Sequence, residues 1–151
     1  MKNTHMLDKW DQRFMDLAKF IATWSKDPST QVGAVVANAH TKRVVSMGFN
    51  GFPTGVDDLQ DRLDNREIKY EMIVHAETNA LLFAGPAAEG CTLYVSPLPP
   101  CARCGVVIIQ AGIKRVVAPF PDKTKEPWKT QSVISEQMFK EAGIVLDYIE
   151  I

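Results

Sequence analysis

Residues 91–120 read CTLYVSPLPPCARCGVVIIQAGIKRVVAPF, a stretch in which two β-rich runs flank a helical one. The runs CTLYV and KRVVAPF are typical of strands, and CARCGVVIIQAG is typical of a helix that ends at Gly112. A further helix in QSVISEQMFKEAG, ending at Gly143, and a last strand in IVLDYIE continue the alternation. Strands separated by helices join through right-handed crossovers, so this half predicts parallel strands with helices on the faces of the sheet.

The first half of the chain predicts a helix, a β-hairpin, a loop and a second helix. Asp8 can cap the first helix, whose apolar residues recur at helical spacing and are expected in the core: Trp10, Phe14, Leu17, Ala18, Ile21 and Trp24. QVGAVVANA and RVVSMGF form the hairpin, residues 50–66 read as a loop, and the second helix runs from near His75 to Gly85. Together these elements predict one domain over residues 1–151, a three-layer α/β/α fold whose five-stranded mixed sheet begins with an antiparallel pair.

Composition narrows the function classes. A net charge of -1 argues against a strong nucleic-acid-binding face, so no nucleic-acid partner is expected. The amino terminus is too polar for a signal peptide and no apolar run has the length of a membrane span, so we expect a cytoplasmic protein without membrane contact. Three cysteines, two of them three residues apart, favour metal or redox chemistry over a disulfide framework.

Two short motifs offer metal ligands. His75 opens HAETNA, and Cys101 and Cys104 belong to PCARC; each motif stands where a strand or loop leads into a helix. The positive end of a helix favours anions, so we expect it to lower the pKa of both thiols. One imidazole and two thiolates make three zinc ligands, and a catalytic zinc keeps its fourth position for water.

A closed structural zinc site would need a fourth protein ligand. Cys91 begins a predicted strand, where a buried thiol is the expectation, while His5 lies in the terminus and His40 in the hairpin turn, where both are expected to be solvated. The sequence therefore favours an open site over a closed one.

Glu77, two residues after His75, has two interpretations. Beside a water that a metal activates, it can move protons to a ring nitrogen and a leaving amine. By its position alone it is better explained as a surface carboxylate in the first turn of a helix. The combination of H-x-E with P-C-x-x-C, however, is the signature of zinc-dependent nucleobase deaminases.

The sequence closely resembles the deoxycytidylate (dCMP) deaminases of the cytidine deaminase superfamily. The resemblance runs through DPSTQVGAVV, GFNGFP, HAETNA, TLYVSPLPPCARC, IIQAGIKRVV and EAGI. It implies a cytidine deaminase-like fold and the hydrolysis of dCMP to dUMP and ammonia, which supplies dUMP for thymidylate synthesis. It also implies one catalytic zinc per subunit on His75, Cys101 and Cys104, with Glu77 moving protons. Several members carry a second zinc before the HAE motif, but residues 51–74 contain no Cys or His, so none is expected.

The resemblance also implies contacts to the base and the sugar. The backbone N–H of Ala76 would meet the cytosine carbonyl, and a backbone carbonyl near Ser96 would accept from the exocyclic amine. Phe120 stands where many relatives carry a tyrosine and could close over the base without a hydroxyl. Asn50 would contact the sugar, or it is a turn residue, since Asn-Gly is a common turn pair.

Cations for the substrate phosphate are expected at Lys26, after the first helix, and at Lys123 and Lys125, in PFPDKTKEPW. A solvated lysine is the usual alternative for each of them.

The resemblance to family members that carry GFNGFP implies a regulated homo-oligomer, expected to be a hexamer, that dCTP activates and dTTP inhibits. The effector site would comprise Gly48, Phe49, Asn50, Gly51, Phe52 and Pro53, a segment with glycines enough for two arrangements. Mg²⁺ could accompany the triphosphate, and departures from the family in the acidic stretch 57–64 could alter the binding of either one. The alternative is that Gly51 and Pro53 merely turn the chain.

Two other functions stay open. A deaminase of tRNA or of polynucleotides would use the same chemistry but needs a basic face for the phosphate backbone. A non-catalytic, zinc-stabilised binding module would need a fourth ligand and would leave Glu77 without a role.

Overall fold

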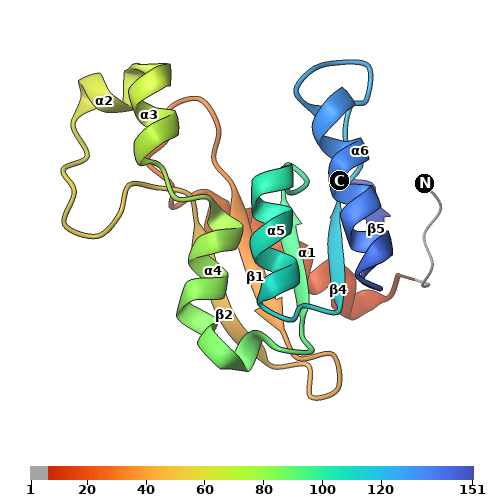
Figure 1. Ribbon diagram of the computed structural model, residues 1–151. Coiled ribbons are helices and arrows are strands. Elements are labelled where there is room, and N and C mark those ends of the chain that lie inside the picture. The colour runs from red at the N-terminus through yellow and green to blue at the C-terminus, as the bar shows by residue number, and fades with distance from the viewer. Residues whose placement is uncertain (1–6) are drawn as a thin grey trace.

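The computed structural model describes residues 7–151 (Figure 1), so His5 lies outside the described part. The elements in chain order are α1 (Lys9–Ala22), β1 (Gly33–Ala37), β2 (Val44–Phe49), α2 (Gln60–Asp64), α3 (Arg66–Met72), α4 (Ala76–Ala84), a 3-10 turn (Gly85–Ala88), β3 (Thr92–Ser96), α5 (Ala102–Gln110), β4 (Arg115–Pro119), α6 (Trp128–Glu141) and β5 (Val145–Ile149). In the described range no helix is both long and apolar enough to cross a membrane.

The five strands form one mixed sheet in the order β2-β1-β3-β4-β5. β1 pairs antiparallel with both β2 and β3, whereas β3, β4 and β5 are parallel to one another. The predicted hairpin, the parallel second half and the five-stranded mixed sheet are all confirmed.

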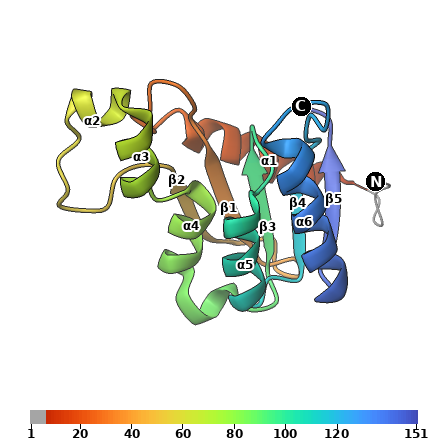
Figure 2. The same cartoon turned by 45° about the horizontal axis from the view of Figure 1, so that its top comes forward.

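Helices cover both faces of the sheet, with α1 on one side and α4, α5 and α6 on the other (Figures 1 and 2). Alternate strand residues divide between the two cores, as the two-residue period of a strand requires. Val35 and Val117 pack with α1, while Val36 and Val116 pack in the core beneath the other helices. This is the predicted three-layer α/β/α arrangement.

α1 begins where the sequence predicts and lies close to the sheet. Asp8 caps it by accepting from the backbone N–H groups of Trp10 and Asp11. A Cβ at Gly33 would lie 2.0 Å from the Ala18 carbonyl oxygen, so only glycine allows this approach of β1 to the helix. The expectation that Trp24 is a core residue is wrong: the helix ends at Ala22, and Trp24 is 52% exposed.

The segment between β2 and α4 differs most from expectation. Residues 60–64 form α2 inside the predicted loop, and α3 was not predicted at all. Both helices are short and polar, and each buries one side chain, Leu63 in α2 and Lys69 in α3. A helix with one buried residue has no apolar period for sequence reasoning to detect.

Candidate active site

His75 is the N-cap residue of α4, and the residue before it is fixed by backbone pairing. Val74 and Gly51 form an isolated antiparallel bridge, with N···O distances of 2.8 Å from Val74 to Gly51 and 3.1 Å in the opposite direction. The GFNGFP segment after β2 thereby holds the chain at the point where α4 begins.

Cys101 is the N-cap residue of α5, and Cys104 lies in the first turn of that helix. α4 and α5 start at the same edge of the sheet, where β3 and β4 end (Figure 1). His75 Nδ1 lies 3.1 Å from Cys104 Sγ and 3.7 Å from Cys101 Sγ. The two motifs therefore meet in one cluster.

The cluster fits a zinc ion. The three ligand atoms lie within 4.8 Å of one another, and no other group of three or more potential metal ligands was found among residues 7–151. Tetrahedral zinc with usual bond lengths places its nitrogen and sulfur ligands roughly 3.5 Å apart, close to the distances found here. Nδ1 of His75 is the ring nitrogen that faces both sulfurs.

The thiols titrate as a pair. Hydrogen bonds from Cys104 and His75 lower the pKa of the Cys101 thiol to about 4, against the effect of burial. The hydrogen bond to Cys101 and burial raise the pKa of Cys104. The expectation of a lowered pKa for both thiols is thus wrong for Cys104. Once Cys101 has lost its proton, the negative charge on its sulfur makes the loss of the Cys104 proton less favourable. Metal coordination reverses this effect, since a coordinating thiol is deprotonated.

Glu77 is buried rather than solvated, with 4% of its surface exposed, so the interpretation as a surface carboxylate is wrong. Burial raises the pKa of Glu77 to about 7, against the opposing charge of His75. A buried carboxyl group with a pKa near neutrality can both accept and release a proton at physiological pH. Position in the sequence could not reveal this burial; the H-x-E motif predicted the role of Glu77 in proton transfer but not its environment.

Gly48 brings β2 against the start of α4. A Cβ at this position would lie 2.5 Å from the Ala80 nitrogen and 2.6 Å from the Ala76 carbonyl oxygen. The next residue is tied to the same helix, because Asn79 Nδ2 donates to the Phe49 carbonyl at 2.8 Å. The segment 48–51 therefore packs directly on the turn of helix that carries Glu77.

The sequence profile of the family described as "Cytidine and deoxycytidylate deaminase zinc-binding region" matches residues 8–119. The chain belongs to this deaminase family. An uncharacterised deaminase in the luxG 3' region of Aliivibrio fischeri is 44% identical over 147 residues, covering 95% of this chain and 96% of the relative. The deoxycytidylate deaminase of Mus musculus is 40% identical over 145 residues, covering 90% and 77%.

Solved structures support the same fold. The dCMP deaminase of the cyanophage S-TIM5, in complex with dCMP and dUMP, matches with a TM-score of 0.72 and 23% identity, covering 96% of this chain and 100% of the phage chain. The cytidine deaminase-like fold implied by the resemblance is therefore confirmed.

Asn50 is buried in the deaminase, and its side-chain amide is engaged by the loop after α1. Nδ2 donates to the Thr30 carbonyl at 2.9 Å, and Oδ1 accepts from the Val32 N–H at 2.8 Å. The amide thus ties the segment after β2 to the loop after α1, which is a structural role. Its contact with a sugar stays a prediction.

A buried ion pair that no sequence pattern predicted lies beside Asn50. Lys69 Nζ lies 3.1 Å from Asp27 Oδ1 and 2.7 Å from Ser29 Oγ, and the two charged side chains are 10% and 4% exposed. Asp27 Oδ1 also accepts from the N–H of Ser29 at 2.9 Å and from that of Thr30 at 3.2 Å. Aspartate before Pro-Ser-Thr is a signal for such a turn, but nothing in the sequence identified Lys69 as its partner.

The three lysines expected at the phosphate are exposed and lie near carboxylates. Lys26 Nζ lies 2.9 Å from Asp58, Lys123 Nζ lies 2.9 Å from Glu136, and Lys125 Nζ lies 4.0 Å from Asp122. Exposed pairs of this kind are weak, so a phosphate can compete for each lysine.

The structure also places the residues expected at the base. Ala76 is the first residue of α4, and Ser96 ends β3; both are buried. Phe120 is 47% exposed and packs on Tyr148, with ring centroids 5.2 Å apart. Phe120 also lines a hollow of about 480 Å³ beside the start of α1. Contacts of these residues with a base stay predictions.

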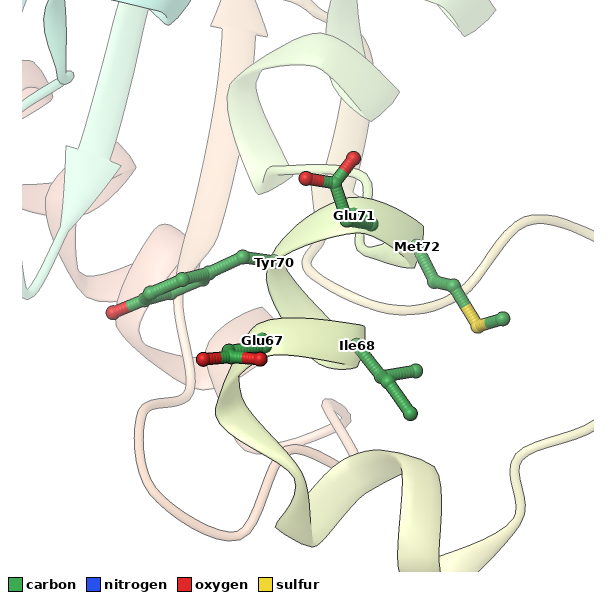
Figure 3. Close-up of a pocket in the computed structure, with 5 residues that line it drawn as sticks. All are labelled: Glu67, Ile68, Tyr70, Glu71 and Met72. Atoms are coloured by element: carbon green, nitrogen blue, oxygen red, sulfur yellow. The ribbon is translucent and has the colours of Figure 1, made fainter.

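A larger hollow, of about 600 Å³, lies on α3 and includes none of the predicted site residues. Figure 3 shows Tyr70 and Glu67 on one side of the helix and Ile68 and Met72 on the other. Binding sites usually have a few polar groups that converge on one point. The side chains here diverge, so this surface does not compete with the His75 cluster as the candidate active site.

Proposed function

We propose that this deaminase hydrolyses dCMP to dUMP and ammonia, with a zinc ion held by His75, Cys101 and Cys104. The observation that carries the proposal is the buried carboxyl group of Glu77, two residues after the ligand His75, in a chain whose curated relatives include deoxycytidylate deaminases. The reaction would supply dUMP for thymidylate synthesis in the cytoplasm.

A zinc ion held by His75, Cys101 and Cys104 would supply a Lewis acid that lowers the pKa of a water molecule toward neutrality. As the water oxygen attacks the ring carbon that carries the amine, Glu77 takes one proton from the water and delivers it to the ring nitrogen. Glu77 then takes the second proton of the former water and delivers it to the amine, which leaves as ammonia while the water oxygen becomes the new carbonyl. Because Glu77 is enclosed by protein, the proton passes to the substrate rather than to bulk water.

The ends of secondary structure around the cluster orient the base. Ala76 is the first residue of α4, where backbone N–H groups have no helical acceptor, so its N–H can donate to the cytosine carbonyl. The backbone carbonyl near Ser96, at the end of β3, accepts from the exocyclic amine. Asn50 meets the sugar and Phe120 covers the base.

Ultraviolet absorbance tests this proposal against its rivals. Absorbance should fall when the purified protein meets dCMP, and a chelator should abolish the fall. Turnover of an oligonucleotide or a tRNA in place of dCMP would instead identify a polynucleotide deaminase. Zinc binding without turnover of any of these substrates would identify a binding module.

A preference for dCMP over deoxycytidine is the first consequence. A charge-assisted hydrogen bond to phosphate contributes about 1.5–3 kcal/mol, so kcat/KM should favour dCMP by roughly tenfold or more. Replacing Lys123 or Lys125 with glutamine should lower the ratio of the two kcat/KM values. Replacing Lys140, an exposed lysine in the last turn of α6, with glutamine should leave this ratio unchanged. Equal kcat/KM values for the two substrates in the unmodified enzyme would contradict the phosphate contact.

Regulation by end products is the second consequence. A triphosphate bound with Mg²⁺ against residues 48–53 would act on α4, because Gly48 touches the backbone of Ala76 and Phe49 is tied to Asn79. In a homo-oligomer such as a hexamer, dCMP saturation should be sigmoidal, with dCTP straightening the curve and dTTP depressing it. Superimposable hyperbolic curves together with a monomeric mass in solution would exclude this regulation.

A further inference from the structure

The first peptide group of α5 is held by a side chain from α6. Ala102, the residue after the ligand Cys101, donates its backbone N–H to Gln131 Oε1 at 2.8 Å. This N–H belongs to the first turn of α5, where no carbonyl of the helix can accept it. The acceptor comes from a residue that is 27 positions beyond the last cysteine of the cluster and belongs to neither motif.

The two helices that carry the partners of this bond, α5 and α6, pack closely against each other. A Cβ at Gly105 would lie 3.3 Å from Met138 Cε and 3.7 Å from Ser135 Oγ, so glycine allows α5 and α6 to approach closely. Gln131 is half-buried one turn before Ser135 on the same helix. Its amide therefore reaches Ala102 from a rigid element rather than from a loop.

The two cysteines differ in what holds them. Cys104 is buried, with 3% of its surface exposed, and lies inside the helix. Cys101 is only half-buried, and it stands at the helix end after the segment 97–100, which has no regular structure. The peptide that joins Cys101 to Ala102 sets the direction of the Cys101 side chain, and Gln131 fixes that peptide.

From this we infer that Gln131 is a positioning residue for the metal site, which holds the Cys101 sulfur where it can coordinate together with His75 and Cys104. The inference rests on the proposed zinc site. A ligand that is already oriented loses less conformational freedom when the ion binds, and partners that orient ligands typically contribute 10–100-fold to metal affinity. A helix cap alone would contribute to stability without changing the affinity for zinc.

The test is the dissociation constant for Zn²⁺, measured on the metal-free protein by competition with a chromophoric chelator. Gln131→Met keeps the length of the side chain and removes the acceptor, so it should bind zinc 10–100-fold more weakly. Gln131→Glu keeps an acceptor oxygen and should bind at least as tightly as the unmodified protein. Gln137→Met, on the same helix, removes an exposed amide that donates to Glu141 and should change nothing.

Cobalt substitution gives a second measurement, since the thiolate-to-Co²⁺ absorption band arises from the bonds of Cys101 and Cys104 and loses intensity when the Cys101 bond is weakened. Gln131→Met should weaken or shift this band, and Gln131→Glu should restore it. Unchanged zinc affinity and an unchanged band in Gln131→Met would overturn the inference and leave the proposed function intact. If the unmodified protein itself binds no zinc, both the proposed function and this inference are wrong. Should Gln131→Met not fold, Gln131→Ala replaces it in both measurements.

Discussion

Glu77→Gln is expected to leave the fold and the zinc content unchanged and to lower kcat for dCMP by at least about 10²–10⁴-fold, the usual contribution of general acid-base catalysis. The amide has nearly the shape of the carboxylic acid, so it fits the same buried place. It cannot carry a proton between water and substrate, and no other carboxylate joins the three-ligand cluster in the described chain.

The measurement combines steady-state kinetics with metal analysis and circular dichroism. Glu71→Gln is the matched control, because Glu71 is exposed on α3 and its replacement makes the same chemical change outside the cluster. Its kcat should equal that of the unmodified enzyme. Near-full turnover in Glu77→Gln would show that the assignment of roles is wrong, and loss of zinc would show that the carboxylate supports the metal site rather than the chemistry.

The sequence predicted the parts of the molecule in which local pattern and chemistry agree. The strands around residues 91–120 are apolar and end at turns, so their parallel direction followed from crossover rules. Motif spacing predicted that one site contains His75, Cys101 and Cys104, and the distances between their ligand atoms agree with that prediction.

What could not be predicted depends on contacts between distant segments. The burial of Glu77 needs the sheet beneath α4, and the orientation of Asn50 needs the backbone of residues 30–32. Lys69 looks like any exposed lysine in a polar stretch, yet its partner lies 42 residues earlier in the chain. Pairings of this kind leave no periodic signal in the sequence.

Lys69→Met is expected to lower the free energy of unfolding by about 3–5 kcal/mol, the usual cost of leaving one member of a buried ion pair without its partner. Methionine retains the apolar stem of lysine and removes the charge. Asp27 would then stay buried with its remaining donors, the N–H groups of Ser29 and Thr30, the Ser29 hydroxyl and the amide of Asn50.

Lys26→Met is the matched control, because Lys26 and Asp58 form a pair of the same chemistry at 2.9 Å with 71% and 38% of their side chains exposed. Its loss should cost less than about 1 kcal/mol. Adding Asp27→Asn to Lys69→Met should recover much of the stability, since the asparagine oxygen still accepts from Ser29 and Thr30 while the buried charge is gone.

The pH dependence of unfolding separates charge pairing from simple packing. Burial raises the pKa of Asp27, but the hydrogen bonds from Ser29, Thr30 and Lys69 outweigh it and hold the pKa below its usual value of 3.8. A carboxyl group with a lowered pKa stabilises the fold above its pKa in the unfolded chain and loses that contribution as the pH falls through its pKa in the folded protein. The free energy of unfolding, measured with urea at pH 7, should therefore be lower in Lys69→Met than in the unmodified protein by the full amount expected for the broken ion pair. This difference in free energy should shrink below about pH 4 as Asp27 takes up a proton. A difference that stayed constant down to pH 2 would mean that the loss comes from packing or from the hydrogen bond to Ser29 Oγ, neither of which methionine reproduces, and not from the charge pair with Asp27.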